Sequence, residues 1–283
     1  MTTYQPYPDL EPQSIAATRD ALHAYSRDLG EWSKTCRPKR KHWWHASLRP
    51  SLMGLTTGTI HSGISFELQL NLRESLLQGR TSNGKELVEA LGGQPAAELG
   101  ESIENFLIAG GLDERFIPGG AQPNDESTAF PGYSAECADT LAGALSAVSA
   151  AMAEFRAGIR EETSPIQLWP HHFDLSMLWL PGDKVSGQDP ANEEYADKQM
   201  NFGFTFGDEG IPEPYLYVTA YPLPEKFPGL QLPAGTTWRT EGFSGAVLLY
   251  RSLKQSADPT GYLIDLWNDL LSAGREHMNV CAN

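Results

Sequence analysis

Apolar residues recur at three- and four-residue steps in four segments of the chain, the spacing that puts side chains on one face of a helix. These segments are residues 14–36, 96–109, 133–159 and 259–275. In the first segment Leu22, Leu29 and Trp32 lie on the apolar face, and Gly30 is its one weak position. Pro259 suits the first turn of the last segment. The sequence therefore predicts four principal helices.

Between the helices the apolar period changes to two, which is typical of strands with one buried face. In the first half of the chain these segments are residues 42–52, 64–72, 75–82 and 85–91. In the second half they are residues 166–180, 200–206, 215–221 and 245–253. The Asn83-Gly84 pair is a favoured hairpin turn. We therefore expect an α+β protein with antiparallel sheets packed on about four helices.

The order helix, strands, helix occurs twice, which predicts two similar halves that form one compact unit. Residues 1–110 are the expected first half and residues 133–283 the second. Residues 111–132 are rich in Gly, Pro and Asp and lack periodicity, so they are the expected connecting loop. When the strands that open the two halves are aligned, His45 falls on His172. The identities are too few to establish a duplication.

The segment LWPHHFDLSMLW, residues 168–179, contains two adjacent histidines followed by an aspartate. Side chains on a strand alternate between faces, so His171 is expected on the apolar face as a core histidine. His172 and Asp174 are then expected together on the polar face. Because such neighbours can jointly hold a substrate or a metal, these two are the better functional candidates.

The first half has a matching polar face. In its opening strand Trp43, His45 and Arg49 share that face, and Glu67 lies on the polar face of the next strand. A polar sheet face turned to water is ordinary in antiparallel proteins, which is the alternative interpretation. If the two halves pack about a pseudo-twofold axis, His45 and His172 converge and form a site.

Acid–base chemistry needs the fewest coincidences among these residues. His45 and His172 are interpreted as acid–base or ligand residues, with Asp174 and Glu67 as the carboxylates that orient them. A divalent metal held by His45, His172 and Asp174 is a second alternative. A non-haem iron triad would add His277 to the pair in the second half, although no Arg-x-Ser follows His277. The spacing does not choose between these chemistries, so the cofactor stays open.

A second group of polar residues precedes and enters the strand at 215–221. Aromatic rings with carboxylates close to them can bind polar or cationic ligands. The alternative is a half-buried hairpin whose hydroxyl groups reach water. The candidate ligand-binding residues are Trp43, Arg49, Asp208, Glu213, Tyr215 and Tyr217.

Charge and composition narrow the class of partner. A net charge of −15 repels phosphate backbones and anionic lipid, so neither nucleic acid nor a membrane surface is an expected partner. No apolar run approaches the ~20 residues that span a bilayer, and the N-terminus has no signal-peptide pattern. Three cysteines without metal-type spacing indicate reduced thiols and a cytoplasmic protein. The basic run RPKRK at 37–41 is interpreted as a solvated turn rather than an anion-binding patch.

Several enzyme classes are excluded, because the chain lacks the glycine-rich dinucleotide loop, the phosphate-binding loop and the nucleophile elbow. The leading interpretation is a protein that binds a small polar molecule on a sheet face bearing His, Asp and Glu. Acid–base or metal-assisted chemistry would follow there. The alternative is a non-enzymatic interaction or scaffold protein with an exposed Tyr and Trp surface. A pocket favours the first and a flat apolar patch the second.

Blocks of sequence extend over nearly the whole chain: HWWHASL at 42–48, GLTTGTI at 54–60, TSNG at 81–84, SPIQLWPHHFDLS at 164–176, FGFTFGD at 202–208 and PEPYLYVTAYP at 212–222. These blocks resemble those of a bacterial family of uncharacterised proteins, a domain of unknown function. The resemblance implies a cytoplasmic bacterial protein of one full-length unit. It implies no activity.

Overall fold

The computed structural model describes residues 6–119, 128–192 and 194–278. The elements up to the second α-helix are α1 (Pro12–Cys36), η1 (Lys41–Ala46), β1 (Arg49–Ser51), β2 (Gly54–Thr56), β3 (Ile60–Ser62), β4 (Ile64–Asn71), β5 (Leu76–Thr81), β6 (Glu86–Ala90) and α2 (Ala96–Ala109). Then follow η2 (Glu114–Phe116), α3 (Ala135–Ala157), β7 (Glu162–Thr163), β8 (Gln167–Trp169), β9 (Asp174–Leu180), β10 (Gln199–Thr205), β11 (Tyr215–Tyr221), η3 (Phe227–Gly229), β12 (Thr236–Arg239), β13 (Gly245–Leu249), α4 (Tyr250–Lys254) and α5 (Pro259–His277). The strands form two antiparallel sheets, which confirms the α+β class.

The chain forms two compact units, where the sequence led us to expect one. The first unit consists of Met1–Ser146 and Gln167–Phe173, and the second of Ala147–Ile166 and Asp174–Asn283. The division falls inside α3, so the first unit extends beyond the first half expected from the sequence. Of the expected connecting loop, residues 120–127 lie outside the described residues.

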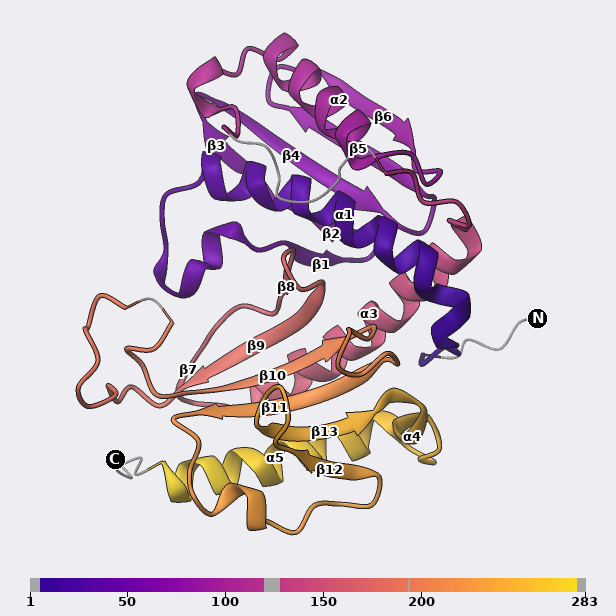
Figure 1. Ribbon diagram of the computed structural model, residues 1–283. Helices are drawn as coiled ribbons and strands as arrows, with labels where there is room; N and C mark the ends of the chain where they lie inside the picture. Colours follow the sequence, from indigo (N-terminus) through magenta and orange to yellow (C-terminus); the bar gives the residue numbers. More distant parts are fainter. Residues whose placement is uncertain (1–5, 120–127, 193, 279–283) are drawn as a thin grey trace. The chain divides into compact units, whose positions relative to one another are not determined.

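The sheet of the first unit has the strand order β1-β2-β4-β5-β6, with β3 paired to β4. Helices α1 and α2 lie along one of its faces (Figure 1). Phe66, Leu68 and Leu70 of β4 are fully buried, as their period of two predicts. Phe106 of α2 lies so close to Gly79 of β5 that a Cβ at Gly79 would be 2.7 Å from the Phe106 ring. The core of this unit is therefore the space between the sheet and the two helices.

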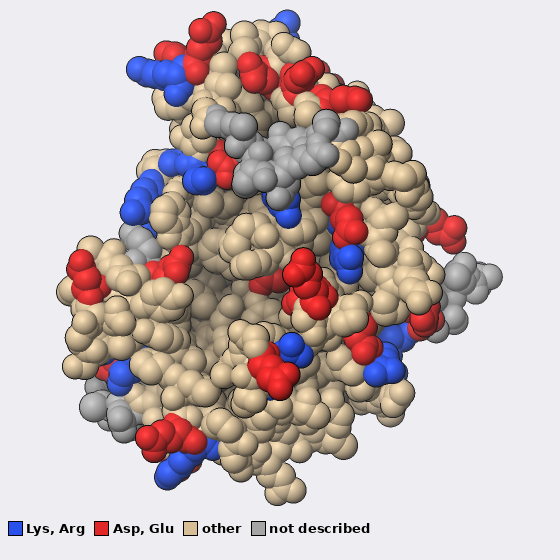
Figure 2. Space-filling view, viewed as in Figure 1, with Lys and Arg blue, Asp and Glu red and all other residues tan. Residues whose placement is uncertain are grey.

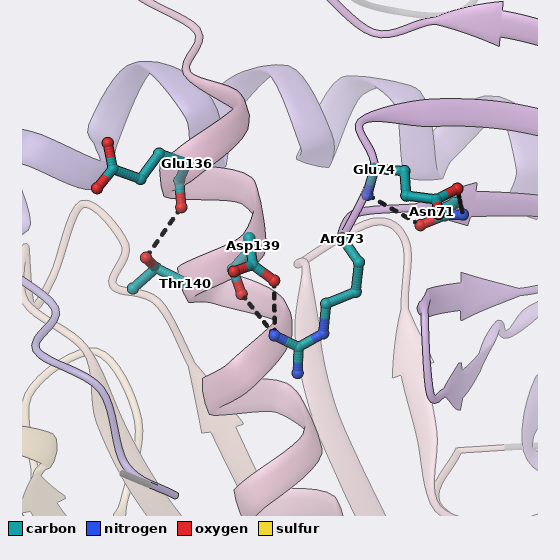
Figure 3. A network of polar contacts seen from close by, with 6 residues as sticks. All are labelled: Asn71, Arg73, Glu74, Glu136, Asp139 and Thr140. Atoms are coloured by element: carbon teal, nitrogen blue, oxygen red, sulfur yellow. Dashed lines mark hydrogen bonds and ion pairs between the residues drawn. The ribbon is translucent and has the colours of Figure 1, made fainter. Parts of the chain in front are cut away.

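The first half of α3 is attached to the first unit by polar contacts (Figure 3). The Arg73 side chain, from the turn after β4, donates to Asp139 Oδ1 at 2.6 Å and to the Asp139 carbonyl oxygen at 3.3 Å. Asn71 and Glu74 close that turn, since the Glu74 amide donates to Asn71 Oδ1 at 3.1 Å. The bonds from Arg73 join the N-terminal part of α3 to the first unit.

Gly30 lies in the middle of α1 because the segment Gln167–Phe173 packs against the helix there. A Cβ at Gly30 would be 2.6 Å from Pro170 Cγ, well inside van der Waals contact. Leu168 is held nearby by two backbone hydrogen bonds of 3.0 Å with Leu48. The weak position predicted in the first helix is therefore a packing requirement.

The sheet of the second unit has the strand order β12-β13-β11-β10-β9-β7. Its apolar face packs on the second part of α3 and on α5: the Phe155 ring lies 4.9 Å from that of Phe202 and 5.4 Å from that of Trp267. In the first sheet β1, β2, β4, β5 and β6 follow one another in chain order, with β3 off this path, whereas β13 in the second lies between β11 and β12. The similarity of the two halves is therefore limited to helices packed on one antiparallel sheet each.

The first part of the strand predicted at 42–52 is wrong, because residues 42–46 belong to the 3₁₀ helix η1, and strand β1 begins only at Arg49. His42 and Trp43 adopt left-handed backbone conformations with φ of 51° and 57°. Alternate rings then stack: His42 on Trp44 at 5.9 Å and Trp43 on His45 at 5.6 Å. The period of two in this segment reflects ring stacking within a tight turn and not a pleated strand.

Candidate functional site

The second sheet brings a tyrosine and an aspartate together on the face turned away from the helices. Tyr217 lies opposite Gly203, and Gly203 lies opposite Ser176. Because Gly203 has no side chain, the Tyr217 ring extends across β10; a Cβ at Gly203 would be 2.0 Å from Tyr217 Cζ. The Tyr217 hydroxyl thereby reaches β9 and donates a hydrogen bond to Asp174 Oδ2. The absence of a side chain at Gly203 thus leaves the space that the Tyr217 ring occupies.

Asn201 on β10 is the third polar residue at this position. Its Nδ2 group donates to the Tyr217 hydroxyl at 3.5 Å. Its Oδ1 atom is buried and accepts no hydrogen bond from any described residue. Asp174 itself is 7% exposed. One phenol is therefore contacted by polar groups of two strands: it donates to Asp174 of β9 and accepts from Asn201 of β10.

A second phenol–carboxylate pair adjoins the first. The Tyr215 hydroxyl donates to Asp208 Oδ2 at 2.5 Å, and the rings of Tyr215 and Tyr217 are 6.2 Å apart. Asp208 Oδ1 accepts the backbone amides of Gly210 and Ile211 at 2.7 and 2.8 Å, which fixes the turn that carries it. The structure thus brings together four residues predicted from the sequence. With Asn201 they form the tyrosine–aspartate cluster: Asp174, Asn201, Asp208, Tyr215 and Tyr217.

Both phenols of the cluster remain protonated at neutral pH. Burial, followed by the charge and hydrogen bond of Asp174, raises the pKa of Tyr217 well above its ordinary value. Burial and the hydrogen bond to Asp208 raise the pKa of Tyr215 in the same way. The two hydroxyl groups therefore act as donors, and the carboxylates and the Asn201 amide oxygen act as acceptors.

Glu213, the fifth residue predicted in this region, has a different role. Its carboxylate forms an ion pair of 2.9 Å with Arg251 of α4. The arginine side chain is 69% exposed, so the pair is one of the solvent-screened kind that contributes at most about 1 kcal/mol. Glu213 is therefore assigned to the connection between β11 and α4 and not to the cluster.

In the first unit Trp43 and His45 are in contact, but neither Arg49 nor Glu67 forms a hydrogen bond or ion pair with His45 among the described residues. His45 is buried, and its Nδ1 atom accepts the Arg40 backbone amide at 3.2 Å. Glu67 Oε1 accepts the hydroxyl of Thr56 on the neighbouring strand at 2.7 Å. The histidine and the carboxylate predicted to act together in this unit are thus each bonded to other groups.

The predicted strand at 166–180 is interrupted by a turn, which overturns the assignment of the two histidines to opposite faces. Pro170 has no amide hydrogen, and the amides of His172 and Phe173 both donate to the Trp169 carbonyl oxygen. His171 and His172 are both exposed, with their rings 4.2 Å apart, so the interpretation of His171 as a core histidine is wrong. Conversely, Asp174, expected on an open polar face, is buried.

A third histidine, His23 of α1, lies half-buried against this turn. Its ring stacks on Phe173 at 5.6 Å, and its Nε2 atom lies 3.2 Å from the His171 carbonyl oxygen and 3.3 Å from Arg27 Nη2. Burial, and then the charge of Arg27, lower the pKa of His23 to about 4. The sequence did not single out His23, because a histidine on a helix carries no signal until its tertiary neighbours are known.

We expect the stability of the protein to fall between pH 7 and pH 4 partly because of His23. The unfolded chain binds a proton at this residue near the ordinary value of 6.5, whereas the folded chain does so only at about 4. The contribution of neutral His23 is therefore present above pH 6.5 and is lost as the pH falls toward 4. Urea unfolding at pH 7.5, 5.5 and 4.5 measures the loss, and His23→Gln should reduce it. His61→Gln, at an exposed histidine of the same unit, controls for removal of a ring; an equal effect of both variants contradicts the assignment.

The divalent metal considered from the sequence finds no ready set of ligands in the described chain. Within residues 6–119, 128–192 and 194–278, no three His, Cys, Asp or Glu side chains come together as a metal would require. The cysteines do not suggest one either: Cys36 is buried and donates to the Phe116 carbonyl oxygen, whereas Cys281 lies outside the described residues.

Comparison with known families shows the family of nearly the whole chain. The model of a family of unknown function (DUF5996) matches residues 7–280. The chain belongs to DUF5996. No curated protein and no solved structure matches it. The DUF5996 region includes both compact units, and so it includes the tyrosine–aspartate cluster.

Among the helices that the structure describes, none has the length and apolar character needed to cross a bilayer.

Proposed function

We propose that this DUF5996 protein binds a small polar molecule through the tyrosine–aspartate cluster of its second unit. The observation that carries the proposal is the hydrogen bond from Tyr217 to the buried carboxylate of Asp174, made across a glycine that leaves room for the ring. Three adjacent strands contribute polar groups to this point: Asp174 from β9, Asn201 from β10 and Tyr217 from β11. Such convergence of a few polar groups among apolar ones is typical of small-molecule sites.

The polarity of the cluster indicates the kind of molecule. Two carboxylates and the Asn201 amide oxygen accept hydrogen bonds, so a ligand that carries N–H or O–H donors complements them. Small amines and polyols have this character. In an acid–base reaction Asp174 would act as the base, and Tyr217 would hold it in position. The acid–base roles predicted for His45, His172 and Glu67 concern the first unit and are not required for this binding.

The alternative function, a scaffold with an exposed Tyr and Trp surface, has less support. Among the described residues the exposed aromatic side chains are Trp43, at 38%, and Tyr195, at 45%, and they belong to different units. Tyr215, which would have been part of such a surface, is 3% exposed. The tyrosines of β11 therefore favour an internal network over a docking surface.

A thermal-shift screen of small amines, polyols and organic acids tests the proposal, because a molecule that binds the folded state raises its melting temperature. Tyr217→Phe keeps the ring over Gly203 and removes only the hydroxyl group. We expect the best compound to bind this variant about tenfold more weakly, the loss of one hydrogen bond to a charged group. Tyr221→Phe, on the same strand and sheet face, is the matched control and should bind normally. An unchanged affinity in Tyr217→Phe, or no stabilising compound, would sink the proposal.

A further inference from the structure

Three arginine side chains gather in the first unit without an acidic partner among the residues that the structure describes. Arg37, Arg40 and Arg49 form no ion pair with any carboxylate of the described chain. This is not a shortage of acids, because the protein has 36 Asp and Glu residues against 21 Lys and Arg. Like charges placed together without a counter-charge cost free energy, so their arrangement requires an explanation.

Arg37 is held at the end of β2 by backbone carbonyl groups. Its Nη2 atom donates to the Thr57 carbonyl oxygen and lies 3.5 Å from that of Gly58. Arg49, on β1, is the cross-strand partner of Thr56, the residue next to that anchor. The Arg37 side chain, from the residue after α1, is therefore anchored next to the strand position opposite Arg49, although twelve residues separate the two arginines in the chain.

Arg49 is also held through one terminal nitrogen. Its Nη1 atom donates to Ser47 Oγ at 2.7 Å and to Gln167 Oε1 at 3.2 Å. A guanidinium group has five N–H donors. In both Arg37 and Arg49 the Nε atom and the other terminal nitrogen make no hydrogen bond to a described residue. Each arginine is thus fixed in place through one nitrogen, while its other N–H donors make no hydrogen bond to a described residue.

Arg40 completes the group from the turn between α1 and η1. Its backbone amide donates to His45 Nδ1, and its side chain is exposed. Burial, followed by the charges of Arg37 and Arg40, lowers the pKa of Arg49 to about 10. The positive charge is therefore concentrated at a half-buried place with one side open to solvent.

We propose that Arg37, Arg40 and Arg49 form a binding site for a dianionic phosphate group, either free or carried by a small molecule. Guanidinium forks match the oxygens of phosphate, and a dianion offsets most of three positive charges, whereas a single carboxylate offsets only one. The site lies in the first unit, so it is independent of the tyrosine–aspartate cluster. The run at residues 37–41 alone predicts a solvated turn, and the structure adds Arg49 to its charges.

The negative charge of the rest of the protein favours a ligand with a single phosphate group over a polyanion. A net charge of −15 repels polyanions, whereas a single phosphate group interacts mainly with charges inside the screening length of about 8–10 Å. On the face drawn in Figure 2, described basic side chains lie in small groups among acidic ones and form no broad basic surface. Both observations favour a small phosphate-bearing molecule over a nucleic acid.

Titration of the full chain with sodium phosphate, followed by melting temperature and by calorimetry, tests this site. Sodium chloride at equal ionic strength measures the relief of repulsion by screening alone, and sodium acetate tests a monoanionic carboxylate. We expect phosphate to raise the melting temperature by several degrees more than either salt. Phenyl phosphate distinguishes the two sources: binding as tight as that of inorganic phosphate indicates a phosphate ester, and much weaker binding indicates the free ion.

Arg40→Gln is the decisive variant, because the side chain is exposed and its removal leaves the fold intact. We expect phosphate to bind it about tenfold more weakly. Without phosphate, its melting temperature should equal or exceed that of the natural chain, since one repulsive charge is gone. Arg80→Gln, at a 79% exposed arginine paired with Glu86, is the matched control and should bind phosphate normally. Equal stabilisation by chloride or acetate, or equal phosphate binding by the two variants, would overturn the proposal.

Discussion

Replacing Gly203 by alanine is expected to lower the free energy of unfolding by about 3 kcal/mol, at the upper end of overpacking effects. The added Cβ would be 2.0 Å from Cζ of the Tyr217 ring, a separation that no two non-bonded carbon atoms can tolerate. The ring must then leave β10, and its hydroxyl loses Asp174. Urea unfolding of the purified variant, followed by circular dichroism, measures the loss.

A double-mutant cycle separates this clash from a general weakening of β10. Tyr217→Ala removes the ring. Gly203→Ala should therefore lower the free energy of unfolding much less in the Tyr217→Ala variant than in the natural chain. Gly229→Ala is the control in the same unit, because no atom lies within 4 Å of the Cβ that it would add. Additive costs at Gly203 and Tyr217 would show that the ring does not lie over the glycine.

Replacing Gly30 by alanine is expected to destabilise the protein by about 1–2 kcal/mol, although alanine is the better helix former by about 1 kcal/mol. The reason is the Pro170 ring, whose Cγ and Cβ atoms would lie 2.6 and 2.8 Å from the new Cβ. A rigid ring in a turn cannot rotate away as a flexible side chain would. The same unfolding experiment measures the change.

Gly100→Ala provides the matched control, since Gly100 lies inside α2 and its nearest neighbour would be Asp28 Oδ2 at 3.7 Å. There the helix preference acts alone, and we expect stabilisation by about 0.5–1 kcal/mol. The two substitutions are chemically identical and should have opposite signs. If both stabilise the chain, the segment Gln167–Phe173 does not pack on α1 as described.

Much of the fold was predictable because burial imposes a period on the local sequence. The helices α1, α2, α3 and α5 each confirm a predicted segment, and β4, β10 and β11 have the predicted buried faces. At Gly203 a further signal was present and was missed: a glycine inside a strand indicates the close approach of another group. It could have pointed to Tyr217, but not to the strand register that puts them opposite each other.

The alternation of residue types predicted a strand wrongly where that alternation has another cause. In η1 the rings of residues two apart stack on one another within a turn. At Pro170 a strand pattern continues through a residue that cannot donate to a sheet, and the chain turns there. The predicted faces of His171 and His172 depended on an uninterrupted strand, so they failed together.

The sequence by itself determined the α+β class, the main helices and the acidic charge, because each depends on composition or on the spacing of near neighbours. Only the tertiary structure decided which polar residues meet. Asp174 and Tyr217 are 43 residues apart and come together through the register of three strands. Arg49 joins Arg37 through the pairing of β1 with β2. The strand register and the turns are those that give the whole unit its lowest free energy. They therefore cannot be predicted from a local pattern of residues.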